Sequence, residues 1–406
     1  MLQLLKNYDH RLWNLALGWF TSSLGFALVI PFIAIYFHGQ GMTLTQIGLF
    51  FGITAVIRAT VQAYGGELSD QVGRYRLMIV AQLCRAVVFA FLAAAVHYSW
   101  GLIAVGALII VNFIFGALFQ PAANSTVADL VGNNRRTEAF AIVRAAGNLG
   151  WAVGPAIGGY MAASSLALLL LLSGIITALS GFIILFFLKG IEFNRRADAN
   201  GSFRQMFILK GNETMFHHAG LLFILYLVVA HLMAPLSLYS VDFRGLAESQ
   251  LGHLYMLNGL MVVFLQLPMA RLMRPFRLTS QMAAGAFVYA VGYFLVGLSA
   301  EYAMFIVSMI IITSGELLIS PPALAITANL APPDKVGRYM GIYGFAVTAG
   351  WSLGPLVGTL LLDLFKPDFV FSWGAIAVLA VVAGMGFIRL HRHIAPEVNT
   401  YRDIIT

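Results

Sequence analysis

Residues 147–159 read Gly-Asn-Leu-Gly-Trp-Ala-Val-Gly-Pro-Ala-Ile-Gly-Gly, and they decide the kind of fold that the chain can adopt. Gly150, Gly154 and Gly158 are four residues apart. On a helix they therefore form one face without side chains, against which a second helix can pack closely. Pro155 removes one backbone hydrogen bond and is expected to bend the helix. Because so many helical glycines are costly in water, the pattern is typical of a membrane-spanning helix.

The same pattern returns two hundred residues later as Gly350, Gly354, Pro355 and Gly358. Residues 121–159 align with residues 321–359 without a gap, and the shared positions include glycine, tryptophan and proline. Such matches are harder to obtain by chance in an apolar chain than matches of alanine or leucine. We therefore predict two like halves, with the two glycine stripes forming smooth surfaces between them.

The composition is that of a polytopic membrane protein, since 60% of the 406 residues are hydrophobic and 10% are charged. A spanning helix needs roughly 20 apolar residues, and twelve such stretches can be counted, six in each half. The predicted fold is all-α, with twelve transmembrane helices in two pseudo-symmetric six-helix bundles. The expected domains are a first bundle (1–188), a cytoplasmic linker (189–217), a second bundle (218–390) and a cytoplasmic tail (391–406).

Positive charge gathers on one side of the predicted spans. If both termini are cytoplasmic, the inner loops and tails carry 19 of the 24 lysines and arginines. This bias indicates the topology, and the basic residues are expected to contact anionic lipid headgroups. The net charge of +7 therefore does not point to nucleic acid. The single Cys84 excludes an intrachain disulfide. No metal-spaced set of histidines and cysteines is present, and we expect neither a metal nor a cofactor.

The stretch after the second span resembles the signature loop of the major facilitator superfamily, Gly-x-Leu-x-Asp-Arg-x-Gly-Arg. Gln71 replaces the usual arginine, while the other positions match at Gly66, Leu68, Asp70, Gly73 and Arg74. The element at 147–159 resembles the fifth-helix motif of the bacterial drug:proton antiporter branch, whose members have twelve spans. Asn112, four residues before Gly116, stands where those antiporters usually carry a proton-coupling arginine.

The resemblance implies a latch at the cytoplasmic side. Asp70 would face the start of the eleventh helix near residues 337–341, where the helix dipole favours a negative charge. Arg74 would pair with Asp129 at the end of the fourth span. By its position six residues after Glu138, Arg144 is expected near enough to the surface to snorkel or to join the Asp70 and Asp129 cluster. The alternative is a loop that only sets topology and carries a solvated ion pair.

Glu316 is the only carboxylate well inside a predicted span, and the repeat aligns it with Gly116. A carboxylate in hydrocarbon favours its neutral form unless a cation or water meets it, so Glu316 is a candidate to take and release a proton. The resemblance places its helix at the central cavity, within reach of substrate. The alternative is a hydrogen-bonded structural residue beside Ser314.

Two arginines, Arg58 and Arg85, are also buried by sequence, in the second and third spans. Both are expected roughly 12–14 Å above the cytoplasmic helix ends, where they can be neighbours. Their partners can be backbone carbonyls, Glu316, or an anionic substrate group, or the side chains can snorkel. His231 in the seventh span can titrate near neutrality or simply pack, and Asn112 can bind substrate or join helices.

These features predict a secondary active transporter that works by alternating access and is not an enzyme. The expected activity is proton-coupled multidrug efflux, in which amphipathic small molecules leave by antiport with protons. The expected location is the bacterial cytoplasmic (inner) membrane. The expected partners are the lipid bilayer, a small-molecule substrate and protons, and the protein is expected to act as a monomer. The alternative is transport of an organic anion, a siderophore or a lipid-like anionic substrate through the buried arginines. A membrane enzyme or sensor is disfavoured because the sequence lacks a nucleophile–base set and a phosphate-binding glycine loop.

Overall fold

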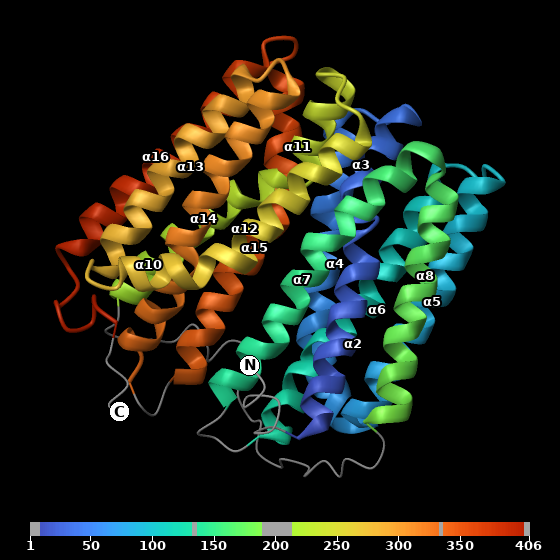
Figure 1. Cartoon of the computed structure of the whole chain (residues 1–406), viewed down its shortest axis with the longest axis horizontal. Coiled ribbons are helices and arrows are strands. Elements are labelled where there is room, and N and C mark those ends of the chain that lie inside the picture. Colours follow the sequence, from blue (N-terminus) through green and yellow to red (C-terminus); the bar gives the residue numbers. More distant parts are fainter. Residues whose placement is uncertain (1–8, 132–135, 189–212, 333–335, 402–406) are drawn as a thin grey trace. The chain divides into compact units, whose positions relative to one another are not determined.

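The computed structural model describes residues 9–131, 136–188, 213–332 and 336–401, and every element within these ranges is helical (Figure 1). The elements of the first half are α2 (His10–Ala27), α3 (Ile30–Gly39), α4 (Leu44–Val72), α5 (Arg74–His97), α6 (Leu102–Leu130), α7 (Arg136–Ser164) and α8 (Leu166–Phe187). Those of the second half are α10 (Glu213–Val229), η2 (Ala230–Leu232), α11 (Ala234–Leu238), η3 (Tyr239–Phe243), α12 (Glu248–Met273), α13 (Leu278–Leu298), α14 (Tyr302–Leu330), α15 (Val336–Leu364) and α16 (Phe369–His391).

The number of spans agrees with the sequence. Eleven helical segments among the described residues are long and apolar enough to cross a membrane. The glycine-rich helix α7, with 29 residues, is the twelfth long helix. The fold is therefore the all-α membrane architecture that the composition predicted.

Helix contacts repeat between the two halves of the sequence. In the first half α2 packs on α7 and α8, while α5 packs on α6 and α8. In the second half α10 packs on α15 and α16, while α13 packs on α14 and α16. These are the same pairs when the helices of each half are matched in chain order, and the internal duplication is therefore confirmed at the level of helix packing.

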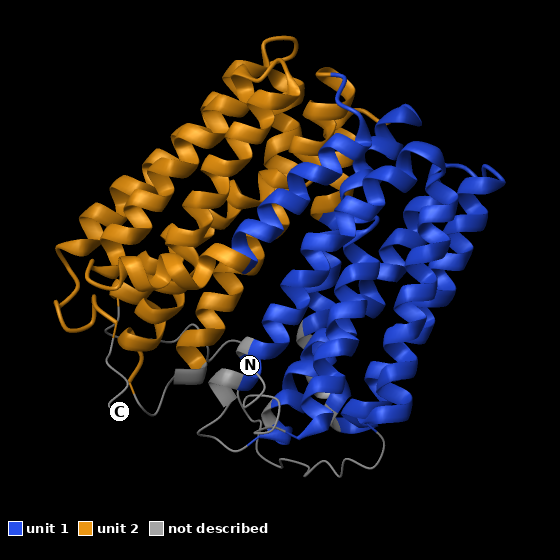
Figure 2. Cartoon of the chain, in the orientation of Figure 1, with its two compact units in different colours: residues 1–41, 53–198, 245–263 blue, residues 42–52, 199–244, 264–406 orange. Residues whose placement is uncertain are grey.

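The chain divides into two compact units (Figure 2). Unit 1 comprises Met1–Gly41, Ile53–Asp198 and Gly245–Val263, and unit 2 comprises Met42–Gly52, Ala199–Arg244 and Phe264–Thr406. Each unit takes in a segment from the other half of the sequence. The first part of α12 belongs with α7, and the first part of α4 belongs with α15. Most of the predicted linker, residues 189–212, lies outside the described residues.

The first glycine stripe packs inside its own half, which corrects the expectation that it forms a surface between halves. A Cβ atom added at Gly150 would lie 2.7 Å from the carbonyl oxygen of Phe20, and one at Gly154 would lie 2.7 Å from Cβ of Ala27. Gly158 meets the chain just beyond, with a built Cβ 2.8 Å from the ring of Phe32. The stripe therefore allows α7 to touch the backbone of α2 and the start of α3.

The second stripe does the same in unit 2. A Cβ at Gly350 would lie 2.8 Å from the backbone nitrogen of Leu227, and one at Gly354 would lie 2.7 Å from its carbonyl oxygen. Gly358 lies beside His231 and Pro235. In both halves the partner helix is broken at this level, because α2 ends at Ala27 and α10 ends at Val229. The glycines lie where an interrupted helix brings its backbone closest to a neighbour.

Contacts between the two sequence halves use other faces of the same helices. In unit 1, Gly252 and Gly259 of α12 pack against Pro155 and Ala152 of α7, next to the stripe. In unit 2, a Cβ at Gly52 of α4 would lie 3.2 Å from Leu356 of α15. The sequence pattern identified helices that pack closely but not the partner of each face, because these helices are apolar on every side.

The described part of the predicted tail folds back onto unit 2. Asn399 is fully buried, and its side chain accepts a hydrogen bond from the backbone N–H of Thr279 at 2.9 Å and donates one to the Thr279 hydroxyl at 2.8 Å. Asn329 near the end of α14 donates to the carbonyl oxygen of Val398 at 2.9 Å. The segment through residue 401 therefore ties the start of α13 to the end of α14.

Candidate functional site

Glu316 is the middle residue of α14, 14 residues from each end of that helix. Its side chain is half-buried. The carboxylate interacts electrostatically with the hydroxyl of Tyr289, a buried residue of α13 that also interacts with Tyr226 of α10. Ser314 donates its hydroxyl to the carbonyl oxygen of Ile310 in its own helix at 2.8 Å. A carboxyl group therefore stands beside a phenol at the centre of a spanning helix in unit 2.

Arg58 and Arg85 are neighbours in unit 1, as the spacing in the sequence predicted, and their charges interact. Each guanidinium group lies over an aromatic ring, and the two rings contact each other. Arg58 lies over the ring of Phe113 at 5.4 Å, and Arg85 lies over the ring of Phe26 at 5.6 Å. The two rings meet edge to face at 5.5 Å, so the cations lie on a shared aromatic surface.

Arg85 is 4% exposed and is held by polar groups of its own helix and of α2. It donates to the hydroxyl of Ser22 on α2 and to the amide oxygen of Gln82 on its own helix, both at 3.2 Å. Its Nε atom is buried and has no hydrogen-bond partner among the described residues. Within the described part of the chain, neither Arg85 nor Arg58 forms an ion pair with a carboxylate.

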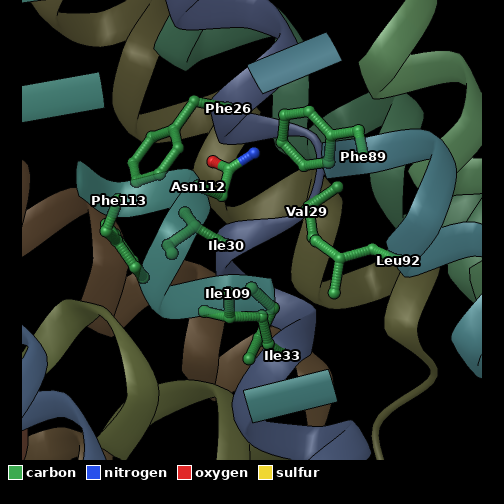
Figure 3. Close-up of a pocket in the computed structure, with 9 residues that line it drawn as sticks. All are labelled: Phe26, Val29, Ile30, Ile33, Phe89, Leu92, Ile109, Asn112 and Phe113. Atoms are coloured by element: carbon green, nitrogen blue, oxygen red, sulfur yellow. The ribbon is translucent and has the colours of Figure 1, made fainter. Parts of the chain in front are cut away.

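Asn112 lies on α6, one turn before Gly116, and is also 4% exposed. Its Nδ2 atom is buried, and no residue in the described part of the chain forms a hydrogen bond with it. Figure 3 shows this amide in a small pocket, with its nitrogen on the side of Phe89 and its oxygen on the side of Phe26. The pocket has an otherwise apolar lining and a cavity of ≈ 10 Å³, room for about one water molecule.

Arg85 packs against the surface that Gly116 leaves open. A Cβ atom built at Gly116 would lie 3.5 Å from Nε and 3.6 Å from Cζ of Arg85, which is ordinary contact. The internal repeat places Gly116 at the position of Glu316 in the other half. One half therefore has a carboxylate at this level, and the other has an open space beside a cation.

His231 lies in η2, where the seventh span is interrupted, and is fully buried. Its Nδ1 atom donates to the carbonyl oxygen of Leu227 at 2.7 Å, one of the groups that the broken helix leaves free. Its Nε2 atom has no hydrogen-bond partner within the ranges that the structure describes, and its ring meets that of Tyr293 edge to face at 6.4 Å. This geometry is that of a packing residue that caps a helix break.

At the start of α5, the predicted pairing of Arg74 with Asp129 is confirmed. Arg74 is 8% exposed, forms an ion pair with Asp129 and donates to the carbonyl oxygen of Ser125 at 3.1 Å. Gly73 between α4 and α5 has a φ of 97°, which requires glycine's freedom. The surroundings of Gly66 and the side chain of Asp70 lie outside the described part of the chain. Residues 333–335 before α15 lie outside it as well. Arg144 is exposed on α7.

Sequence reasoning missed Ser22, Gln82 and Tyr289 as members of these sites. Gln82 and Arg85 are three residues apart on α5, and this helical spacing was a usable signal. Ser22 and Tyr289 come from helices that are far from their partners in the sequence. Ser22 reaches Arg85 because α2 packs on helices that also contact α5, and Tyr289 reaches Glu316 because α13 packs on α14.

Comparison with known proteins gives consistent results. The family model described as Major Facilitator Superfamily matches residues 15–355 and 219–403. A Na(+), Li(+), K(+)/H(+) antiporter of Planococcus maritimus is 25% identical over 420 residues, covering 95% of this chain and 96% of that protein. Multidrug resistance protein MdtH of Escherichia coli O1:K1 / APEC is 24% identical over 347 residues, covering 84% of each chain. A crystal structure of a POT family transporter in complex with 5-aminolevulinic acid superimposes with a TM-score of 0.76 at 15% identity, covering 96% of both chains.

Proposed function

Because this chain belongs to the major facilitator superfamily, we propose that it exports amphipathic small molecules in exchange for protons, with its two like halves giving alternating access to a site at the level of Glu316. It is an integral membrane transporter. The excess of lysine and arginine on one side supports a location in the bacterial cytoplasmic membrane with both termini in the cytoplasm. The names of two relatives, an antiporter and a multidrug resistance protein, support exchange and efflux.

The observation that carries the proposal is the position of Glu316. About 21 Å of helix separates it from either end of α14, so its carboxyl group lies at the middle of a spanning helix. A carboxyl group at such a depth is neutral unless water or a cation reaches it. It therefore binds a proton when one side is open and releases it when the other opens, with Tyr289 as its polar neighbour.

Solute and proton are coupled if they compete for the same state of this carboxyl group. A transporter whose Glu316 must be deprotonated for solute to bind, and protonated for the empty protein to return, exchanges one for the other. Neither solute nor proton then crosses without the other. This step needs no group beyond Glu316 and a cavity open to one side at a time.

The ion pair of Arg74 and Asp129 supports a role for the loop between α4 and α5 in closing the cytoplasmic side. It fixes the first residue of α5 to the last turns of α6. Gly73 provides the turn between the two helices. In the proposed cycle these contacts hold the inner ends of α5 and α6 as one body while the cytoplasmic side opens and closes.

A second candidate function is transport of an organic anion, a siderophore or a lipid-like anionic substrate. It is favoured by Arg58 and Arg85, which form no ion pair with a carboxylate among the described residues. Exchange of such an anion for protons or for a second anion would use the same alternating cycle.

The test is transport by purified protein in proteoliposomes with an imposed pH gradient and ethidium as the amphipathic probe. We expect Glu316→Gln, whose side chain cannot be deprotonated, to reduce gradient-driven ethidium transport at least tenfold and to abolish ethidium exchange in the absence of a gradient. The matched control is Glu301→Gln, because Glu301 is the exposed N-cap residue of the same helix. Gradient-driven transport at the parent rate in Glu316→Gln would contradict the coupling role.

A further inference from the structure

We propose that Gln266 of α12 is a positioning residue for Glu316, because it holds the turn of α14 that carries the carboxyl group. It does so through a backbone carbonyl group that α14 cannot satisfy by itself. Both residues belong to unit 2. The inference rests on the proposed role of Glu316 in proton exchange, and it adds a residue of a second helix on which that exchange depends.

Two consecutive prolines interrupt the hydrogen bonds of α14 shortly after Glu316. In an α-helix each carbonyl oxygen accepts a hydrogen bond from the N–H group four residues later, and proline has no N–H group. Pro321 and Pro322 therefore leave the carbonyl oxygens of Leu317 and Leu318 without a helical donor. Leu317 follows Glu316 directly and is 2% exposed. A buried carbonyl group of this kind needs a donor from another element.

Gln266 supplies that donor from α12. Its Nε2 atom donates to the carbonyl oxygen of Leu317 at 3.2 Å, and its side chain is half-buried. The bond therefore goes to one of the two carbonyl groups in the middle of α14 that the prolines leave free. We interpret it as a cap that replaces the helical bond lost at Pro321.

The preceding residue of α14 is fixed on another side, by α13. A Cβ atom built at Gly315 would lie 2.9 Å from the carbonyl oxygen of Gly285, and one built at Gly285 would lie 2.9 Å from that of Gly315. The two backbones therefore touch one residue before Glu316, next to Tyr289, whose nitrogen would lie 3.2 Å from the Cβ at Gly315. Gly315 and Leu317 are thus held by different helices, and the carboxyl group stands between them. Functional groups keep their position when neighbouring contacts hold them in this way.

The part of α14 that follows the prolines has contacts of its own. Nε2 of His218 on α10 is hydrogen-bonded to the hydroxyl of Thr327 at 3.2 Å, and Asn329 donates to the folded-back tail at 2.9 Å. α14 therefore has two separately anchored parts that meet at the prolines, where a helix bends most easily. Gln266 holds the end of the first part, so a bend at the prolines leaves Glu316 in place.

The internal repeat shows where such a cap is needed. The first half has Pro121 at the position of Pro321, but the next residue is Ala122 and not a second proline. It also has Gly116 at the position of Glu316. The half that carries the carboxylate is thus the half whose helix lacks more of its own donors.

A double-mutant cycle in purified protein tests the cap without transport. Gln266→Met keeps the length of the side chain but removes its donor, and Pro321→Ala gives the carbonyl oxygen of Leu317 a helical donor again. We expect Gln266→Met to lower the unfolding midpoint of the parent and to leave that of Pro321→Ala unchanged. Pro322→Ala is the matched control background, because it restores a donor to Leu318 instead, and there the loss should return in full. Equal losses in all three backgrounds, or no loss in the parent, would overturn the proposal.

The second test separates positioning from a loss of stability, and it needs no proline variant. Ethidium exchange is measured against pH in proteoliposomes with equal pH on both sides. Ethidium keeps its charge over this range, so the midpoint of the profile reports a group of the protein. We expect Gln266→Met to shift this midpoint by about half a pH unit or more and to reduce gradient-driven transport at least threefold. An unshifted midpoint would overturn the positioning role.

Gln250→Met is the control for this test. Gln250 accepts a hydrogen bond from the backbone N–H of Ala247 at 3.0 Å, at the start of the same helix, and its loss should leave the pH midpoint at the parent value. The same shift in Gln250→Met would contradict a specific role of Gln266. Driven transport at the parent rate in Glu316→Gln refutes proton exchange itself, whereas its loss there, with an unshifted midpoint in Gln266→Met, refutes the positioning role alone.

Discussion

Arg74, the first residue of α5, is fixed to Asp129 near the end of α6 by an ion pair and to the carbonyl oxygen of Ser125 by a hydrogen bond of 3.1 Å. The guanidinium group is largely buried at the level where α5 begins and α6 ends. One arginine therefore satisfies a carboxylate and a backbone oxygen of the neighbouring helix, and the loop that follows α4 is anchored to it.

Removing one partner of this pair should destabilise the protein. Asp129→Asn should lower the free energy of unfolding by about 1–3 kcal/mol, because a hydrogen-bonded charge is left without its partner. The measurement is thermal unfolding in detergent as a double-mutant cycle with Arg74→Met. A coupling near zero, with the two single effects adding up in the double variant, would contradict a direct pair.

The glycine stripe gives a second prediction. Gly154→Ala places a methyl group 2.7 Å from Cβ of Ala27 and 3.0 Å from the backbone of Leu28, so α7 and α2 must move apart. We expect a loss of about 1–3 kcal/mol from overpacking. Gly374→Ala in α16 is the control, since nothing lies within 4 Å of its added Cβ. Equal unfolding midpoints for the two variants would refute close packing at Gly154.

The folded-back tail gives a third prediction. Asn399→Ala removes the side-chain bonds to the backbone and hydroxyl of Thr279 and leaves a buried N–H without an acceptor. We expect a loss of about 1–3 kcal/mol and faster cleavage of the tail by protease. The control Asn148→Ala alters an exposed residue of α7. A tail as resistant to protease as in the parent would show that Asn399 does not hold it.

His231 gives a fourth prediction. His231→Leu removes the donor to the carbonyl oxygen of Leu227 at the helix break, and should cost about 1–3 kcal/mol of stability. Because the ring is fully buried as a packing residue, the pH dependence of transport should keep its midpoint. His97→Leu, at an exposed end of α5, is the stability control. A shifted pH midpoint in His231→Leu would instead make this histidine part of proton transfer.

Most of the fold followed from the sequence because the physics of the bilayer is restrictive. Twelve long apolar stretches must be helices, and matching Gly, Trp and Pro at a spacing of two hundred residues indicated duplication, which the repeated helix contacts confirm. The pair of Arg74 and Asp129 followed from the resemblance to the family's signature loop, and the proximity of Arg58 to Arg85 followed from their depth along neighbouring helices. Charged residues are rare in such a chain, so their positions carry much information.

The remaining features depend on which face of a helix meets which neighbour. Apolar side chains surround most of these helices, so the pattern could not tell that Gly154 packs on α2 while Ala152 packs on α12. The contact of Arg85 with Gly116 was missed for the same reason, because a glycine gives no sign of what fills its space.

The central claim is that one carrier exchanges solute for protons, and the most direct test reverses the usual direction of coupling. Proteoliposomes loaded with ethidium and a fluorescent pH indicator are diluted into ethidium-free buffer at equal pH. The expected result is proton movement opposite to the ethidium flux, present in the parent and in Glu301→Gln but absent in Glu316→Gln. Ethidium efflux from parent liposomes at an unchanged internal pH would contradict proton exchange.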